Sequence, residues 1–128
     1  MLKEGVLGDL SELPSNCVYL KCVDGAHIFN KSEIIYAESK GHRCTIHCNL
    51  GDYHIYVKLD ELEKDFGGAF LRGHQSFLVN MEYVKKISNY KLTLNNDIVL
   101  PVPKARFKQA LRRYEEYQWN KILENNGE

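Results

Sequence analysis

Residues 70–80 have the sequence Phe70-Leu71-Arg72-Gly73-His74-Gln75-Ser76-Phe77-Leu78-Val79-Asn80. Two short apolar runs flank a polar centre that carries a cation, an imidazole, an amide and a hydroxyl. The runs predict two strands, and the polar centre predicts the loop that joins them. No catalytic motif uses these groups in this order, whereas a loop of this kind can contact the phosphates and base edges of nucleic acid.

After this stretch, the pattern predicts further strands and then a helix. Strands are predicted at 84–87, 91–94 and 98–102, and Asn95-Asn96-Asp97 has the composition of a hairpin turn between the last two. Pro103 begins a C-terminal helix, at a position that proline tolerates. The apolar stripe of this helix comprises Phe107, Leu111 and Tyr114, with Ile122 as a further candidate.

Before residue 70, one short helix interrupts a series of strands. Leu59, Leu62 and Phe66 have helical spacing. Asp60 and Glu63 fit a capping box, and Gly67-Gly68 is a natural stop. Earlier strands are predicted at 17–23, 26–29, 33–38, 43–48 and 53–58, with turns at Asp24-Gly25, Lys40-Gly41 and Asn49-Leu50-Gly51-Asp52.

These elements predict a mainly β fold of about ten short strands in small packed sheets. One short helix is inserted and a second helix closes the chain. Helical crossovers between strands are missing, which argues against a parallel α/β core. We expect a linker or N-terminal arm at 1–15, a single domain at 16–124 and a tail at 125–128.

The composition is typical of a soluble globular protein. Of the 128 residues, 44% are apolar and 27% are charged, which suits one domain with one core. No apolar run approaches the roughly 20 residues that cross a bilayer, so no membrane association is expected. The N-terminus lacks the order of a secretory signal, which favours a cytoplasmic location with Cys17, Cys22, Cys44 and Cys48 as reduced thiols.

Charge is unevenly distributed, although the net charge is zero. Between Val84 and Tyr114 the only acid is Asp97, against eight basic residues: Lys85, Lys86, Lys91, Lys104, Arg106, Lys108, Arg112 and Arg113. Acids predominate between Asp60 and Asp65. A segregated basic surface favours a polyanionic partner. The alternative is a solvated helix face beside ordinary surface lysines.

Metal and enzyme chemistry are poorly supported by the cysteines and histidines. Neither Cys17 and Cys22 nor Cys44 and Cys48 have the spacing of a zinc knuckle, so half-buried strand thiols are expected and no metal or cofactor is predicted. The five histidines are scattered, and no nucleophile and base are brought together by spacing. We therefore expect that the protein is not an enzyme.

Three predicted loops combine cations with groups that can contact bases. The first is Lys40-Gly41-His42-Arg43, the second is Gly73-His74-Gln75-Ser76, and the third is Pro103-Lys104-Ala105-Arg106 at the start of the last helix. The amide of Gln75 can pair with adenine, and free N–H groups at a helix start favour a phosphate. Each loop has a simpler interpretation: Gly41 as a turn residue, His74 as a hydrogen-bonded structural histidine, and Arg106 as a solubilising side chain.

From about Ile28 to Leu111 the chain resembles a LytTR-type DNA-binding domain, the output module of many bacterial response regulators. The resemblance rests on five stretches in the same order and spacing: residues 33–39, 41–43, 59–63, 70–80 and 100–104. It implies an elongated β fold of about ten strands. It also implies binding to double-stranded DNA, with loops in successive major grooves and often two copies on repeated sites.

The resemblance implies roles for particular residues. His42 and Gln75 fall where members of the family contact bases, and Lys104 or Arg106 in the third loop would do the same. Arg72 and His74 would organise the second loop or touch phosphate, together with Ser76. The remaining phosphate contacts would be Lys40, Arg43 and Lys108.

The chain departs from the family pattern at two positions. Many members have arginine or asparagine in place of Gln75, so the preferred base can differ. Many have serine in place of Pro103, and proline offers no hydroxyl to cap the helix or to touch phosphate. No receiver domain is recognisable in the 128 residues. The chain is thus expected to be an effector domain of a longer regulator or a stand-alone member.

A second hypothesis is a β-rich protein-interaction or dimerisation module without DNA-binding activity. Its contact surface would be the aromatic group Tyr114, Tyr117 and Trp119 on the last helix. The alternative for these aromatic side chains is packing against the sheet.

Overall fold

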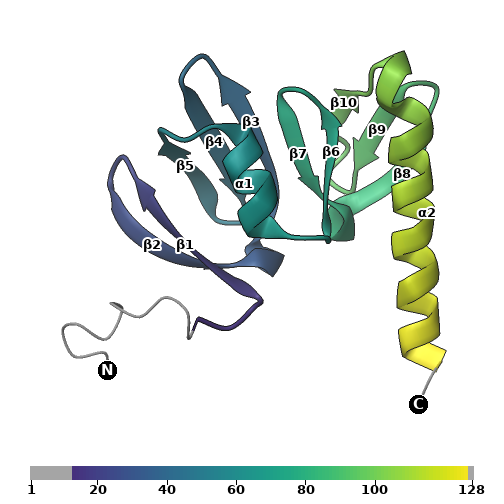
Figure 1. The fold of residues 1–128 in the computed structure, drawn as a ribbon, viewed down its shortest axis with the longest axis horizontal. Coiled ribbons are helices and arrows are strands. Elements are labelled where there is room, and N and C mark those ends of the chain that lie inside the picture. Colours follow the sequence, from purple (N-terminus) through teal and green to yellow (C-terminus); the bar gives the residue numbers. More distant parts are fainter. Residues whose placement is uncertain (1–12, 127–128) are drawn as a thin grey trace.

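In residues 13–126, the range that the computed structural model describes, ten strands form three antiparallel sheets (Figure 1). The strands are β1 (Cys17–Cys22), β2 (Gly25–Asn30), β3 (Ile34–Lys40), β4 (Arg43–Cys48), β5 (Gly51–Ile55), β6 (Phe70–His74), β7 (Phe77–Asn80), β8 (Val84–Ser88), β9 (Lys91–Leu94) and β10 (Val99–Pro101). The helices are α1 (Leu59–Phe66) and α2 (Lys104–Asn126). The predicted fold class is confirmed.

The predicted arm and tail fall largely outside this description. Of the expected arm at 1–15, only residues 13–15 are described, and of the expected tail at 125–128, residues 125 and 126 continue α2. The domain boundaries therefore stay predictions. Within the described range, neither helix combines the length and the apolar character that crossing a bilayer requires.

The three sheets lie side by side along the long axis of the molecule, and α2 runs along the far side of the third (Figure 1). The first sheet is the hairpin β1–β2. The second has the strand order β5-β4-β3-β7-β6, and the third has the order β10-β9-β8. Every pairing is antiparallel, as expected for strands joined by short turns.

Strands of the five-stranded sheet contribute to two hydrophobic cores, one on each face. Ala37 and Leu78 pack into a core shared with the β1–β2 hairpin and α1. Their neighbours Tyr36 and Val79 pack into a core shared with the third sheet and α2. Because successive side chains of a strand point to opposite faces, both faces here need apolar residues. This explains the unbroken apolar run at the start of β7.

Helix α1 has the predicted apolar face, but not the predicted cap. Leu59, Leu62 and Phe66 are buried, and Gly67 ends the helix with a φ of 84°. The N-cap is Lys58, and no side chain caps the helix. The capping box was a wrong prediction, because the helix begins one residue before Asp60. The carboxylates of Asp60 and Glu63 instead accept hydrogen bonds from Arg72.

The predicted and observed elements also differ slightly in where they begin and end. The strand predicted at 53–58 is Gly51–Ile55, and the one predicted at 98–102 is Val99–Pro101. Helix α2 begins at Lys104, one residue after Pro103. Ile122 is exposed and does not belong to the apolar stripe. In Figure 1 the C-terminal turns of α2 extend past the third sheet.

Asn80 is the buried polar side chain at the end of β7, with 2% of its surface exposed. Its amide nitrogen donates to the carbonyl oxygens of Ile34 at 2.9 Å and Lys31 at 3.2 Å. Its amide oxygen accepts from the backbone N–H of Glu82 at 2.9 Å. One side chain thus joins the end of β7 to the start of β3, a connection of backbone groups that are far apart in the sequence.

Replacing this amide should destabilise the fold. Asn80→Ala leaves buried backbone groups without their partners, so we expect a loss of about 2–3 kcal/mol in the free energy of unfolding, measured by urea denaturation. Asn95→Ala, an exposed asparagine in the β9–β10 turn, is the control and should change stability by less than about 0.5 kcal/mol. Equal effects of the two substitutions would contradict the role assigned to Asn80.

Candidate nucleic-acid interface

Three loops lie along one edge of the molecule, the upper edge in Figure 1. They are the β3–β4 turn, the β6–β7 turn and the segment that leads from β10 into α2. The backbone N–H of Ser39 donates to the carbonyl oxygen of Ser76 at 2.9 Å. The guanidinium of Arg106 donates to the carbonyl oxygen of Arg72 at 3.2 Å. One hydrogen bond therefore connects the β6–β7 turn to β3, and the other connects the start of α2 to β6.

The β3–β4 turn presents the first set of predicted contact residues. Lys40 pairs with Arg43, so Gly41 and His42 form the turn. Gly41 has a φ of 65°, which glycine adopts without strain. Lys40, His42 and Arg43 are all exposed. The turn therefore holds two cations and an imidazole in contact with solvent.

Arg72 holds the β6–β7 turn in place. Its side chain is only 13% exposed. Its Nε donates to the carbonyl oxygen of His74 at 3.0 Å, and its Nη2 donates to that of Gln75. Its Nη1 donates to Asp60 at 2.7 Å and Glu63 at 2.9 Å, and this contact holds the pKa of Asp60 below its usual value. One planar guanidinium thus ties two carbonyls of the loop to α1.

The second loop has a fixed backbone and one free side chain. Nδ1 of His74 accepts from the backbone N–H of Ser76 at 2.9 Å, and the His74 ring lies 5.1 Å from that of Phe77. The structural interpretation of His74 is therefore well supported. Gln75 is exposed, and its side chain has no hydrogen-bond partner within residues 13–126. Its amide is free to meet a ligand.

A groove of about 610 Å³ separates the first loop from the second. Gly41 and His42 line one side, and Arg72 and Gln75 line another. Helix α1 closes the groove with Asp60 and other residues. His42 and Gln75, both predicted to contact bases, therefore border the same depression in the surface.

The third loop begins α2. The N–H of Val102 donates to the carbonyl oxygen of Tyr90, and that of Arg106 donates to the carbonyl oxygen of Pro103, both at 2.9 Å. Lys104 and Lys108 are exposed, whereas Arg106 is half-buried. The first turn of α2 contains no acidic residue. Free N–H groups and cations therefore meet at this helix end, an arrangement that favours an anion.

A fourth loop, the β8–β9 turn, lies beside the third and was not predicted to be part of the site. Asn89 and Tyr90 have φ values of 53° and 60°. Tyr90 is 49% exposed, its ring lies 4.8 Å from that of Phe107, and its neighbour Lys91 is exposed. The sequence signal for this turn is weak: Asn89 tolerates a positive φ, but Tyr90 stands where glycine usually accompanies such a value.

Three basic residues of the 84–114 segment have internal partners. Arg106 donates to the carbonyl oxygen of Arg72, as described above. Arg113 donates to the carbonyl oxygens of Gly68 and Phe70, and thereby ties α2 to the start of β6. Lys85 forms an ion pair with Asp97 at 3.3 Å. The positive surface predicted for this segment is therefore smaller than the residue count suggests.

The aromatic side chains of α2 do not form the contact surface of the second hypothesis. The hydroxyl of Tyr114 donates to the carbonyl oxygen of Val84 at 3.1 Å, and that of Tyr117 donates to Glu82. Both rings pack against the core of the third sheet, as the alternative interpretation predicted. Trp119 alone of the three is exposed, at 61%.

Replacing Arg72 with lysine should destabilise the domain and loosen the β6–β7 turn. Arg72→Lys keeps the charge but loses the planar set of donors, so we expect a loss of about 1–3 kcal/mol in unfolding free energy. Amide hydrogen exchange at residues 74–77 should accelerate. Lys64→Ala, at an exposed position of α1, is the control and should leave both measurements unchanged. Unchanged exchange in Arg72→Lys would show that the loop does not depend on this side chain.

Comparisons with known proteins identify the family of this chain. The family model described as the LytTr DNA-binding domain matches residues 24–115. The transcriptional regulatory protein NatR of Bacillus subtilis (strain 168) is 32% identical over 74 residues, which cover 57% of this chain and 32% of NatR. The matched part is thus about a third of that relative.

A solved structure from Bacillus cereus is also similar. It is described as "LytTr DNA-binding domain of putative methyl-accepting/DNA response regulator". The TM-score is 0.64 at 25% sequence identity, and the match covers 77% of this chain and 95% of that one. The fold, the order of the strands and the family match lead to one conclusion: this chain belongs to the family of LytTR DNA-binding domains.

Proposed function

We propose that this domain binds double-stranded DNA in a sequence-specific manner, as the effector part of a bacterial transcriptional regulator in the cytoplasm. The observation that carries the proposal is the set of three loops along one edge, whose flanking segments are joined by hydrogen bonds. Exposed cations lie in the first and third loops, and the free amide of Gln75 lies in the second. Loops on one edge can enter successive major grooves on one side of a duplex.

Phosphate contacts are the first part of the proposal. Lys40 and Arg43 flank the first loop, and Lys108 follows the third. All three are exposed, so their charges are available to neutralise phosphates. The start of α2 adds free N–H groups. Arg72, His74 and Ser76 support the second loop through the hydrogen bonds described above and are not needed as direct contacts.

Base contacts are the second part. His42 and Gln75 border one groove and are exposed. The amide of Gln75 can donate to and accept from adenine in the major groove. In the third loop Lys104 and Arg106 are both candidates. Lys104 is the more accessible of the two, because the guanidinium of Arg106 is partly engaged with the carbonyl of Arg72.

Assembly is the third part. We expect two copies of the domain on repeated sites, and a receiver domain elsewhere in the regulator that delivers the signal. NatR, described as a transcriptional regulatory protein, is about three times as long as the segment it shares with this chain. That length supports the idea of a further domain in a full-length regulator.

The direct test is selection from a random duplex library, followed by affinity measurements on the selected site at several salt concentrations. Log K should fall linearly with log salt, because phosphate neutralisation releases counterions. Affinity that does not change with salt, or no enrichment of any sequence, would overturn the proposal.

Lys104→Ala tests the third loop. If Lys104 meets a phosphate, the salt slope should fall by about 0.9 and affinity should drop equally on all sequences. If it meets a base, discrimination at one position should fall instead. Lys121→Ala is the matched control, because Lys121 is near the opposite end of α2 and pairs with Glu82. A Lys104 variant indistinguishable from the Lys121 variant would remove Lys104 from the interface.

Gln75→Ala tests base contact in the second loop. It should relax the preference at one base position and cost about 1–3 kcal/mol on the selected site. Lys108→Ala provides the comparison, because loss of a phosphate contact weakens binding to all sequences alike. An equal loss for Gln75→Ala on every sequence would assign Gln75 to the phosphates.

A further inference from the structure

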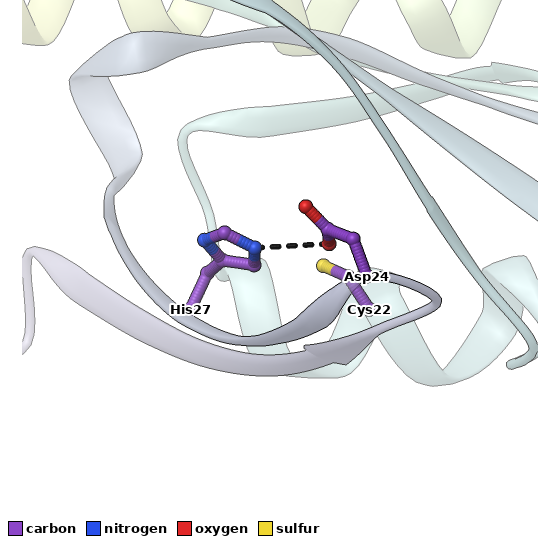
Figure 2. Close-up of side chains that lie close together, drawn as sticks. All are labelled: Cys22, Asp24 and His27. Atoms are coloured by element: carbon purple, nitrogen blue, oxygen red, sulfur yellow. Dashed lines mark hydrogen bonds and ion pairs between the residues drawn. The ribbon is translucent and has the colours of Figure 1, made fainter.

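Three metal-ligating side chains converge at the tip of the β1–β2 hairpin (Figure 2). They are the thiol of Cys22, the carboxylate of Asp24 and the imidazole of His27, and their ligand atoms all lie within 4.8 Å of one another. Nε2 of His27 is 3.0 Å from Oδ1 of Asp24. Figure 2 shows the imidazole nitrogen, the carboxylate oxygen and the sulfur turned towards a common point. The proposed DNA contacts use none of these groups.

The hairpin geometry brings the three donors together. Cys22 pairs with Gly25, and Leu20 pairs with His27, so Cys22 and His27 project from the same face of the hairpin as diagonal neighbours. Asp24 lies in the turn between them. Gly25 has a φ of 135°, which other residues rarely adopt, and its missing side chain leaves the space opposite Cys22 open.

Neighbouring groups hold this arrangement in place. The His27 ring packs edge-on against Tyr53 at 4.8 Å and lies 5.7 Å from Phe29. The N–H of Val23, within the turn, donates to the carbonyl oxygen of His54 at 2.8 Å and fixes the turn to β5. A ligand set that is already ordered loses little conformational entropy on binding an ion.

The donor types select the kind of ion. Magnesium and calcium prefer sites made of oxygen ligands. One sulfur, one imidazole nitrogen and one carboxylate oxygen match the ligands of zinc, whose bond lengths of about 2.0–2.3 Å suit donors spaced as these are. We infer that the hairpin tip binds one Zn²⁺ through Cys22, Asp24 and His27, with a fourth coordination position open.

This inference differs from the sequence-based expectation of no metal site. Cysteine-pair spacing does not detect the set, because its donors are of three different kinds and only one is a cysteine. Zinc binding would release the thiol proton of Cys22 to solvent as the sulfur becomes a thiolate ligand.

The test is a cobalt titration of the whole chain under reducing conditions. Co²⁺ in a four-coordinate site with a thiolate should give visible d–d bands and a near-ultraviolet charge-transfer band, and added Zn²⁺ should abolish both. Cys22→Ser should remove the charge-transfer band. His27→Gln and Asp24→Asn should each weaken Co²⁺ binding by at least about tenfold.

The control is Cys17→Ser, because Cys17 is a half-buried thiol at the other end of the same strand. It should leave both bands unchanged. Far-ultraviolet circular dichroism shows whether each variant is folded, and Asp24→Asn keeps a residue that favours turns. The absence of both bands in the wild-type protein would overturn the inference, as would their persistence in Cys22→Ser and His27→Gln. Zn²⁺ should also raise the Tm of the wild-type chain, but not that of Cys22→Ser.

Discussion

The arrangement of the loops depends on the guanidinium of Arg72. It binds two carbonyls of the β6–β7 turn on one side and two carboxylates of α1 on the other, while the carbonyl of the same residue accepts from Arg106. The carboxylate of Asp60 is mostly exposed, so solvent weakens that part of the contact. The carbonyl contacts are the more important part, because they define the backbone on which Gln75 is carried.

Local signals explain which parts of the fold were predictable. The spacing of Leu59, Leu62 and Phe66, followed by Gly67, identifies α1, because burial on one helix face and a glycine stop at positive φ are both local properties. The cap prediction for α1 was wrong because the helix begins before Asp60, and the carboxylates of Asp60 and Glu63 accept from Arg72 in β6 instead. Sequence spacing does not reveal this contact, because it joins two different elements.

The sequence predicted which loops form the candidate site, but not how these loops are placed relative to one another. Turn residues and cations mark each loop, and the family resemblance supplied the expectation that they act together. The hydrogen bonds Ser39–Ser76 and Arg106–Arg72, which hold the loops side by side, join residues far apart in the sequence and have no local signature. The Asn89-Tyr90 turn was missed for a related reason, since packing of Tyr90 on Phe107 accompanies a backbone conformation that its sequence does not favour.

The charge pattern of α2 has a consequence for the energetics of the free domain. Basic residues gather at the N-terminal end of the helix, where no acid occupies the first turn, and no basic residue occupies the last turn. This order opposes the helix macrodipole, at a cost of about 0.3–1 kcal/mol for each charge near an end. The charge order therefore destabilises the isolated helix, and packing against the third sheet offsets this unfavourable electrostatic energy. An anion bound at the N-terminal end would offset this unfavourable electrostatic energy, so binding an anion there should also stabilise the helix.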